Sequence, residues 1–209
     1  MVEPDIPTLS KIIQDIGDED DIFYIRMFSG KQRHTMYFKF WAKHFEYLDM
    51  LESYPEISGH TIDFGCGSGH SDICLAFKGR KVHGIDNSPT AIAIANYLKS
   101  LQAHEIQDSV SFECLHLDDT VEESEYDSVW SSHCFEHVED PTEIFEGLKK
   151  LTKPAAKMLI SVPFKEHYNH PTHVHWWFSE KEFEEYLSKW TKVLDVKRKN
   201  TVLRALLEL

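Results

Sequence analysis

The chain has 209 residues, a formal charge of −13, 42% hydrophobic residues and 27% charged residues. This length suits a single sizeable α/β domain, and the composition is that of an ordinary globular protein. The acidic charge argues against a nucleic-acid partner, which requires clustered Lys and Arg, and the longest apolar runs are too short to predict a membrane span.

The cysteines and the N-terminus indicate the cellular compartment. The four cysteines have no CxxC spacing, which predicts reduced core thiols rather than a zinc site or a disulfide framework. They are Cys66, Cys74, Cys114 and Cys134. The N-terminus is acidic and contains prolines, unlike the basic and then apolar start of a secretory signal. These features predict a cytoplasmic protein without membrane association.

Residues 1–57 are predicted to form a helical segment that packs on the core. An aromatic-rich stretch, 32–51, has the period of an amphipathic helix. Its expected inward-facing residues are Met36, Phe40, Ala42, Phe45, Leu48 and Leu51.

Three closely spaced glycines, Gly65, Gly67 and Gly69, follow a predicted buried strand and precede a predicted helix over 71–78. Glycine allows positive φ angles and close approach of a ligand to the backbone, and the start of a helix presents unpaired N–H groups. The carboxylate of Asp63 would lie beside this turn. The pattern therefore predicts a cofactor site at the strand–helix junction.

A second acid, Asp86, ends the next predicted strand about twenty residues after the glycines, where βαβ nucleotide sites place the carboxylate that binds ribose hydroxyls. His70 occupies the position where the dinucleotide fingerprint requires its third glycine. The spacing indicates a nucleotide-like cofactor, and a nicotinamide cofactor remains the alternative at the level of the fold.

Further strands and helices alternate along the rest of the chain. The expected strands after Asp86 are 109–115, 126–132 and 157–163, followed by a terminal pair at 193–197 and 202–209. The expected helices begin after Ser88, Asp140 and Ser179, with Pro154 ending the second and Trp190 the third. This order predicts an α/β, Rossmann-like, doubly wound and mostly parallel seven-stranded sheet with a terminal antiparallel strand and helices on both faces.

Several segments resemble the class I S-adenosylmethionine (SAM) dependent methyltransferases. The acid and glycine turn of residues 63–69 resembles their first motif. Phe-Glu-His-Val-Glu-Asp-Pro at 135–141 is similar to a subgroup with Glu-His-Val-x-Asp-Pro after the fourth strand. Residues 159–163 and 173–183 resemble later segments of that subgroup. The resemblance covers residues 58–190.

The resemblance implies a SAM-binding domain over residues 58–209, with 1–57 as a lid or simply packed on the sheet, in one structural domain overall. It implies S-adenosyl-L-methionine as cofactor and S-adenosyl-L-homocysteine as product. In it, Asp63 and the glycine turn hold the methionine part, Asp86 binds the ribose, and Asn87, Leu117 and Asp118 border the adenine. The implied cofactor-binding set is Asp63, Gly65, Cys66, Gly67, Gly69, Asp86, Asn87, Leu117, Asp118 and Ser131.

The implied reaction is methyl transfer to an oxygen or nitrogen of a small-molecule acceptor. Two alternatives within this resemblance are a metal-assisted RNA 3′-terminal 2′-O-methyltransferase and a SAM-binding module without catalysis. Neither the acceptor nor the oligomeric state is encoded in a recognisable motif.

Histidines follow the fourth and fifth predicted strands, and three interpretations of them remain open. They are ordinary polar loop residues, or His133 or His173 is a general base with a pKa suited to neutral pH. In the third interpretation, Glu136, His137 and a later histidine bind a divalent metal, as in the Glu-x-x-Glu-His…His arrangement of small-RNA methyltransferases. Because His133 occupies that pattern's first glutamate position, we expect no metal and no loss of activity on treatment with EDTA.

Overall fold

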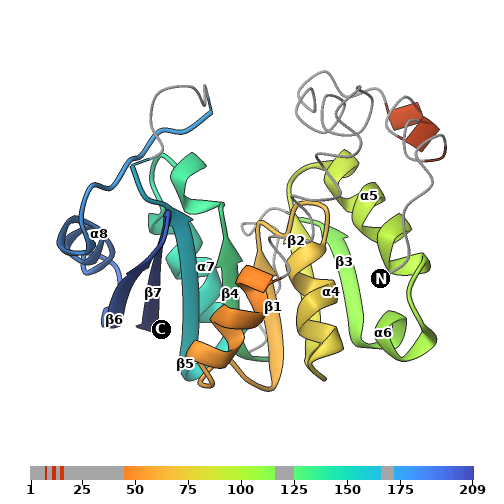
Figure 1. Ribbon diagram of the computed structural model, residues 1–209, viewed down its shortest axis with the longest axis horizontal. Helices are drawn as coiled ribbons and strands as arrows, with labels where there is room; N and C mark the ends of the chain where they lie inside the picture. The colour runs from red at the N-terminus through yellow and green to blue at the C-terminus, as the bar shows by residue number, and fades with distance from the viewer. Residues whose placement is uncertain (1–7, 9–10, 13–14, 17–44, 116–124, 166–171) are drawn as a thin grey trace. The chain divides into compact units, whose positions relative to one another are not determined.

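The computed structural model describes residues 8, 11–12, 15–16, 45–115, 125–165 and 172–209 (Figure 1). They form two compact units. Unit 1 takes the described residues of 1–53 and 66–115, and unit 2 takes those of 54–65 and 116–209. Leu117 and Asp118 lie outside the described residues, as does most of the predicted N-terminal lid.

Unit 1 contains a parallel pair of strands, β2 (Lys81–Asp86) and β3 (Val110–Cys114). The helices α4 (His70–Phe77) and α5 (Pro89–Ser100) lie alongside these strands (Figure 1). The predicted start of α5 is confirmed, since the Ser88 hydroxyl accepts a hydrogen bond from the Ala91 N–H at 3.0 Å.

A short helix, α6 (His104–Ser109), precedes β3 and was not expected. None of its residues is buried, so the sequence carries no apolar period that would indicate a helix there. The third strand accordingly begins at Val110, one residue later than predicted.

Residues 45–53 of unit 1 are helical, as the amphipathic pattern predicts, but the buried face differs. Tyr47, Met50 and Leu51 are buried, whereas Phe45 is 67% exposed. The buried residues have the i, i+3, i+4 spacing of one helix face. The assignment of Phe45 to the core was therefore wrong, because the buried face of this helix is centred on Tyr47, Met50 and Leu51 instead of on Phe45 and Leu48.

Unit 2 carries the larger part of the sheet. Its strands are β1 (His60–Phe64), β4 (Tyr126–Ser132), β5 (Thr152–Pro163), β6 (Lys192–Lys199) and β7 (Val202–Glu208). β4 pairs with β1 and β5 in parallel, while β7 runs antiparallel to both β5 and β6. The helices α7 (Thr142–Leu151) and α8 (Glu180–Leu187) contact β5 and β6 respectively.

The strand order of the seven-stranded sheet is β3-β2-β1-β4-β5-β7-β6. The order of strands reverses between β1 and β4, as in doubly wound sheets. The predicted fold class is confirmed: a mostly parallel sheet with an antiparallel terminal strand and flanking helices.

Two element boundaries differ from those predicted. β5 begins at Thr152 rather than at 157, so Pro154 lies inside a strand instead of following a helix. The β4–β5 register shifts between Tyr126 and Ser128, and Ala155 has a φ of 60°. Such an irregularity accommodates a proline that has no N–H to donate. α8 ends at Leu187, three residues before the predicted end.

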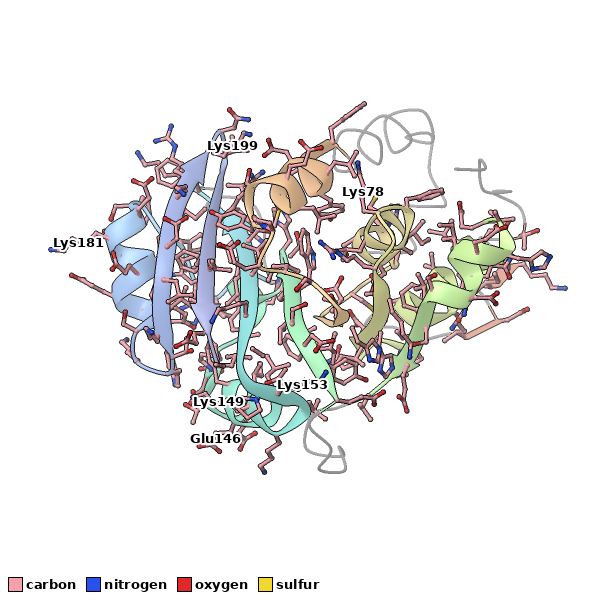
Figure 2. The ribbon with its side chains drawn as sticks, turned by 90° about the horizontal axis from the view of Figure 1, so that it is seen from below. Lys78, Glu146, Lys149, Lys153, Lys181 and Lys199 are labelled. Carbon is pink, nitrogen blue, oxygen red and sulfur yellow. The ribbon has the colours of Figure 1, made fainter. Side chains whose placement is uncertain are left out.

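The basic side chains labelled in unit 2 come from different elements and are exposed (Figure 2). Lys149 of α7 donates to the Trp190 carbonyl at 2.8 Å, and Lys153 of β5 pairs with Asp127 at 2.5 Å. These lysines satisfy local partners instead of forming one basic stripe. Among the described residues, no helix is both long and apolar enough to span a membrane.

Candidate functional site

In unit 2, β1 and β4 meet where the order of strands reverses, the position at which doubly wound sheets bind ligands. Asp63 lies near the end of β1, opposite Trp130 in the register, and is 1% exposed. The Ser131 hydroxyl donates to the Phe64 carbonyl at 2.9 Å, so it joins the ends of the two strands. This bond uses the one proton of the Ser131 hydroxyl, so the hydroxyl could meet a cofactor only as a hydrogen-bond acceptor.

Gly65 has a φ of 73°, which favours glycine. A Cβ at this position would also overlap the side chain of Cys134, which follows β4. Glycine at this position is therefore favoured both by its backbone angle and by the packing of the turn against Cys134.

The rest of the glycine turn belongs to unit 1. Gly67 and Gly69 have φ angles of 54° and 74°, so both adopt the left-handed conformation that the motif predicts. The Cys66 N–H donates to the Ile85 carbonyl at 3.0 Å, which ties the turn to β2. A Cβ on Gly69 would overlap the ring of Phe112.

The carboxylate of Asp86 is held by backbone N–H groups on both sides. Gly67 donates to its Oδ2 at 2.8 Å and Ser88 donates to its Oδ1 at 3.0 Å. These two bonds fix the orientation of the carboxylate at the end of β2. Asn87, the other predicted cofactor residue at this strand end, is exposed.

Asp72, in the first turn of α4, is a buried polar residue that sequence reasoning missed. A Cβ on Gly84 of β2 would lie 2.5 Å from its Oδ1, so the helix and the strand approach closely there. Burial, followed by the charge of Asp72, raises the pKa of the Cys74 thiol to about 12. The sequence signal for Asp72 is an acid in the first helical turn, directly before the apolar residues 73–77.

The four cysteines all lie in described parts of the chain and are thiols, as predicted. Cys66 and Cys74 are buried, but Cys114 is exposed because it lies at the end of the edge strand β3. The expectation of a core position was wrong for Cys114.

His133, a predicted general base, follows β4 in unit 2 with a φ of 55°. The backbone N–H of His133 donates to the Ser161 carbonyl at 2.8 Å, which fixes the backbone at this residue. Its Nδ1 lies 3.5 Å from Oε1 of Glu136, and its side chain is 22% exposed. The imidazole is thus partly accessible, and one of its ring nitrogens faces the carboxylate of Glu136.

His173, the second predicted base, is brought to the same carboxylate. Its ring centroid lies 4.7 Å from that of His137, which belongs to the 3₁₀ helix η3 (Phe135–His137). Ligand atoms of Glu136, His137 and His173 lie within 4.8 Å of one another. The sequence placed these residues after two different strands, and the fold joins them into one polar cluster.

The reversal of strand order, the three left-handed glycines and the fixed acid at the end of β2 define a nucleotide-cofactor fold of the class I methyltransferase type. The chain belongs to the methyltransferase domain family, which it matches over residues 31–192.

Individual proteins resemble parts or all of the chain. It is 32% identical over 117 residues to the ubiquinone biosynthesis O-methyltransferase of Paraburkholderia phytofirmans, covering 54% of this chain and 49% of that protein. The chain spans about half the length of the curated relatives that it matches.

Among solved structures, a SAM-dependent methyltransferase from Aquifex aeolicus has a TM-score of 0.67 at 16% identity, with 99% of both chains covered. The glycopeptide N-methyltransferase MtfA bound to SAM has a TM-score of 0.65 at 10% identity, covering 78% of this chain and 92% of that one. These likenesses show the fold. With the family match, they confirm the predicted enzyme class and its cofactor, SAM.

Proposed function

We propose that this chain transfers the methyl group of SAM to a hydroxyl oxygen of a small-molecule acceptor. The observation that carries the proposal is the carboxylate of Asp86, held by the Gly67 and Ser88 N–H groups at the end of β2. In the resemblance to the class I methyltransferases, a carboxylate at this strand end would bind the ribose hydroxyls of the cofactor.

Oxygen is favoured over nitrogen as the acceptor atom because curated relatives at 28–32% identity are named O-methyltransferases. A small molecule is favoured over nucleic acid because the formal charge of the chain is −13. The SAM sulfonium is itself a strong electrophile, so the protein chiefly has to align the acceptor and remove its proton.

His133 is the proposed general base. Its Nδ1 faces Oε1 of Glu136 at 3.5 Å, which favours the tautomer with the proton on Nδ1 and a lone pair on Nε2. That lone pair would accept the hydroxyl proton as the methyl group is transferred. His173, at 8% exposure, is less accessible to an acceptor.

The cofactor assignment is tested by calorimetric titration with S-adenosyl-L-homocysteine, with NADH as the parallel ligand. We expect micromolar binding of the first and none of the second. Binding of NADH alone would overturn the assignment. Formation of S-adenosyl-L-homocysteine from SAM is then screened against phenols, catechols and amines. Binding without turnover of any of them would favour the SAM-binding module.

The role of Asp86 is tested by Asp86→Ala, for which we expect at least tenfold weaker binding of S-adenosyl-L-homocysteine, because a ribose acceptor is lost. Asp108→Ala, at an exposed acid of α6, is the control and should leave affinity unchanged. Melting temperatures of both variants check that each is folded. Near-native affinity of folded Asp86→Ala would refute the ribose role.

A further inference from the structure

Glu136 is a buried acid with an unfilled acceptor position. Its side chain is 2% exposed, and its Oε2 has no hydrogen-bond partner among the described residues. Burying an ionised carboxylate costs several kcal/mol unless a cation or a set of donors compensates it. Its other oxygen, Oε1, has His133 at 3.5 Å. Oε2 therefore requires a partner that the described protein atoms do not supply.

Two imidazoles lie next to this carboxylate. One ligand atom each from Glu136, His137 and His173 falls within a common span of 4.8 Å. Small side-chain rotations would bring these atoms to the 2.0–2.2 Å that zinc ligands keep from a shared ion. The two histidine rings meet edge to face at 75°, with centroids 4.7 Å apart, so the two imidazoles are in direct contact.

A hydrogen bond to the Thr172 carbonyl sets the tautomer of His137. Its Nδ1 lies 3.1 Å from the Thr172 carbonyl oxygen, which can only accept, so Nδ1 carries the proton. The lone pair of that ring is then on Nε2. A histidine that donates one N–H to a carbonyl and presents the other nitrogen is the usual arrangement around protein-bound metals.

The backbone holds the three residues together. The Glu136 carbonyl accepts hydrogen bonds from the N–H groups of Val174 at 2.8 Å and His175 at 3.2 Å, immediately after His173. Phe135, which precedes Glu136, is fully buried and packs on Phe145 at 5.5 Å. The carboxylate and both imidazoles are thus positioned before any ion arrives.

We propose that Glu136, His137 and His173 bind a divalent transition-metal ion. Two nitrogen donors and one carboxylate suit Zn²⁺ and its neighbours, whereas Mg²⁺ and Ca²⁺ prefer all-oxygen sets. Three protein ligands leave at least one position for water or another oxygen donor. His137 is exposed, which provides a path for the ion. This proposal replaces the expectation of a metal-free protein, and it identifies His173 as the later histidine.

The site is tested by calorimetric titration of EDTA-treated protein with Zn²⁺, with Mg²⁺ as the parallel ion. We expect one Zn²⁺ per chain with a dissociation constant in the micromolar range or below, and much weaker binding of Mg²⁺. His137→Ala and Glu136→Gln should each weaken Zn²⁺ binding at least tenfold. His104→Ala removes an exposed histidine of α6 and should leave the affinity within twofold.

The exposed position of His137 makes its alanine variant the safer test if Glu136→Gln lowers stability, and melting temperatures in metal-free buffer show which variants are folded. Zn²⁺ affinity that is the same in wild-type protein and in folded His137→Ala would overturn the site, as would absence of Zn²⁺ binding in the wild type. The titration contains no SAM, so its failure would leave the proposed methyl transfer untouched.

Discussion

At the scale of single residues, Gly65 shows why one position in the turn admits only glycine. Its φ of 73° is in the left-handed region, and the side chain of Cys134 occupies the place where a Cβ would point. Gly79 has nearly the same φ, 76°, but nothing lies within 4 Å of an added Cβ. An alanine at Gly79 would therefore meet backbone strain alone, whereas an alanine at Gly65 would meet the same strain and also overlap with Cys134.

We expect Gly79→Ala to lower the free energy of unfolding by about 1–2 kcal/mol, the cost of a left-handed L-residue. Gly65→Ala should lower it by about 1–3 kcal/mol more, because Cys134 must also move. Urea unfolding of both variants measures the difference. Equal losses in the two would contradict the close approach to Cys134.

A second residue-scale prediction concerns His133. Asparagine tolerates the φ of 55° found there, so His133→Asn removes the imidazole with little backbone strain. We expect kcat to fall at least a hundredfold, the usual contribution of a general base, with unchanged affinity for S-adenosyl-L-homocysteine. His104→Asn is the control. Full turnover by folded His133→Asn would remove His133 from the mechanism.

At the scale of elements, Glu208 of β7 joins the two strands on either side of it. Lys157 of β5 donates to its Oε2 at 2.5 Å, and Lys192 of β6 donates to its Oε1 at 2.9 Å. Both lysines lie opposite Glu208 in the strand registers. The hydrogen bond from Lys157 is the main cause, and that from Lys192 the next, of lowering the Glu208 pKa from 4.5 to about 2.

A carboxyl whose pKa is lower in the folded state stabilises the fold above its unfolded pKa and loses that effect as it is protonated. We therefore expect the stability difference between wild-type protein and Glu208→Gln to shrink as the pH falls from about 4.5 to about 2. Urea unfolding across that range measures it. Glu105→Gln, on exposed α6, is the control. A difference that stays constant with pH would contradict the prediction.

At the scale of the whole molecule, the charge of −13 bears on the choice of acceptor. We expect no binding of a fluorescent single-stranded RNA at physiological salt and protein concentrations up to about 100 µM, where non-specific binders already associate. Fluorescence anisotropy measures this, and repeating it with Zn²⁺ present covers the metal-loaded state. Salt-sensitive binding would instead favour the RNA methyltransferase that the sequence left as an alternative.

The sequence by itself determined the features that local chemistry controls. The three left-handed glycines, the Ser88 and Ser179 caps and the strand over 126–132 all follow from glycine, capping residues and apolar period. The place of Asp86 at the end of a strand was also predicted from the sequence. Boundaries were missed where no local signal exists: α6 buries nothing, and Pro154 is tolerated in β5 through a register shift against β4.

Only the tertiary structure decided which distant residues act together. The side chain of Cys134 leaves no room for a Cβ at position 65. The hydrogen bonds from the Val174 and His175 N–H groups to the Glu136 carbonyl bring His173 to the carboxylate of Glu136. Sequence spacing placed these groups after different strands, and it could not identify which of several histidines faces Glu136. The reason is physical: strand pairing and loop return set the distances between such groups, and both arise from packing across the sheet rather than from neighbouring residues.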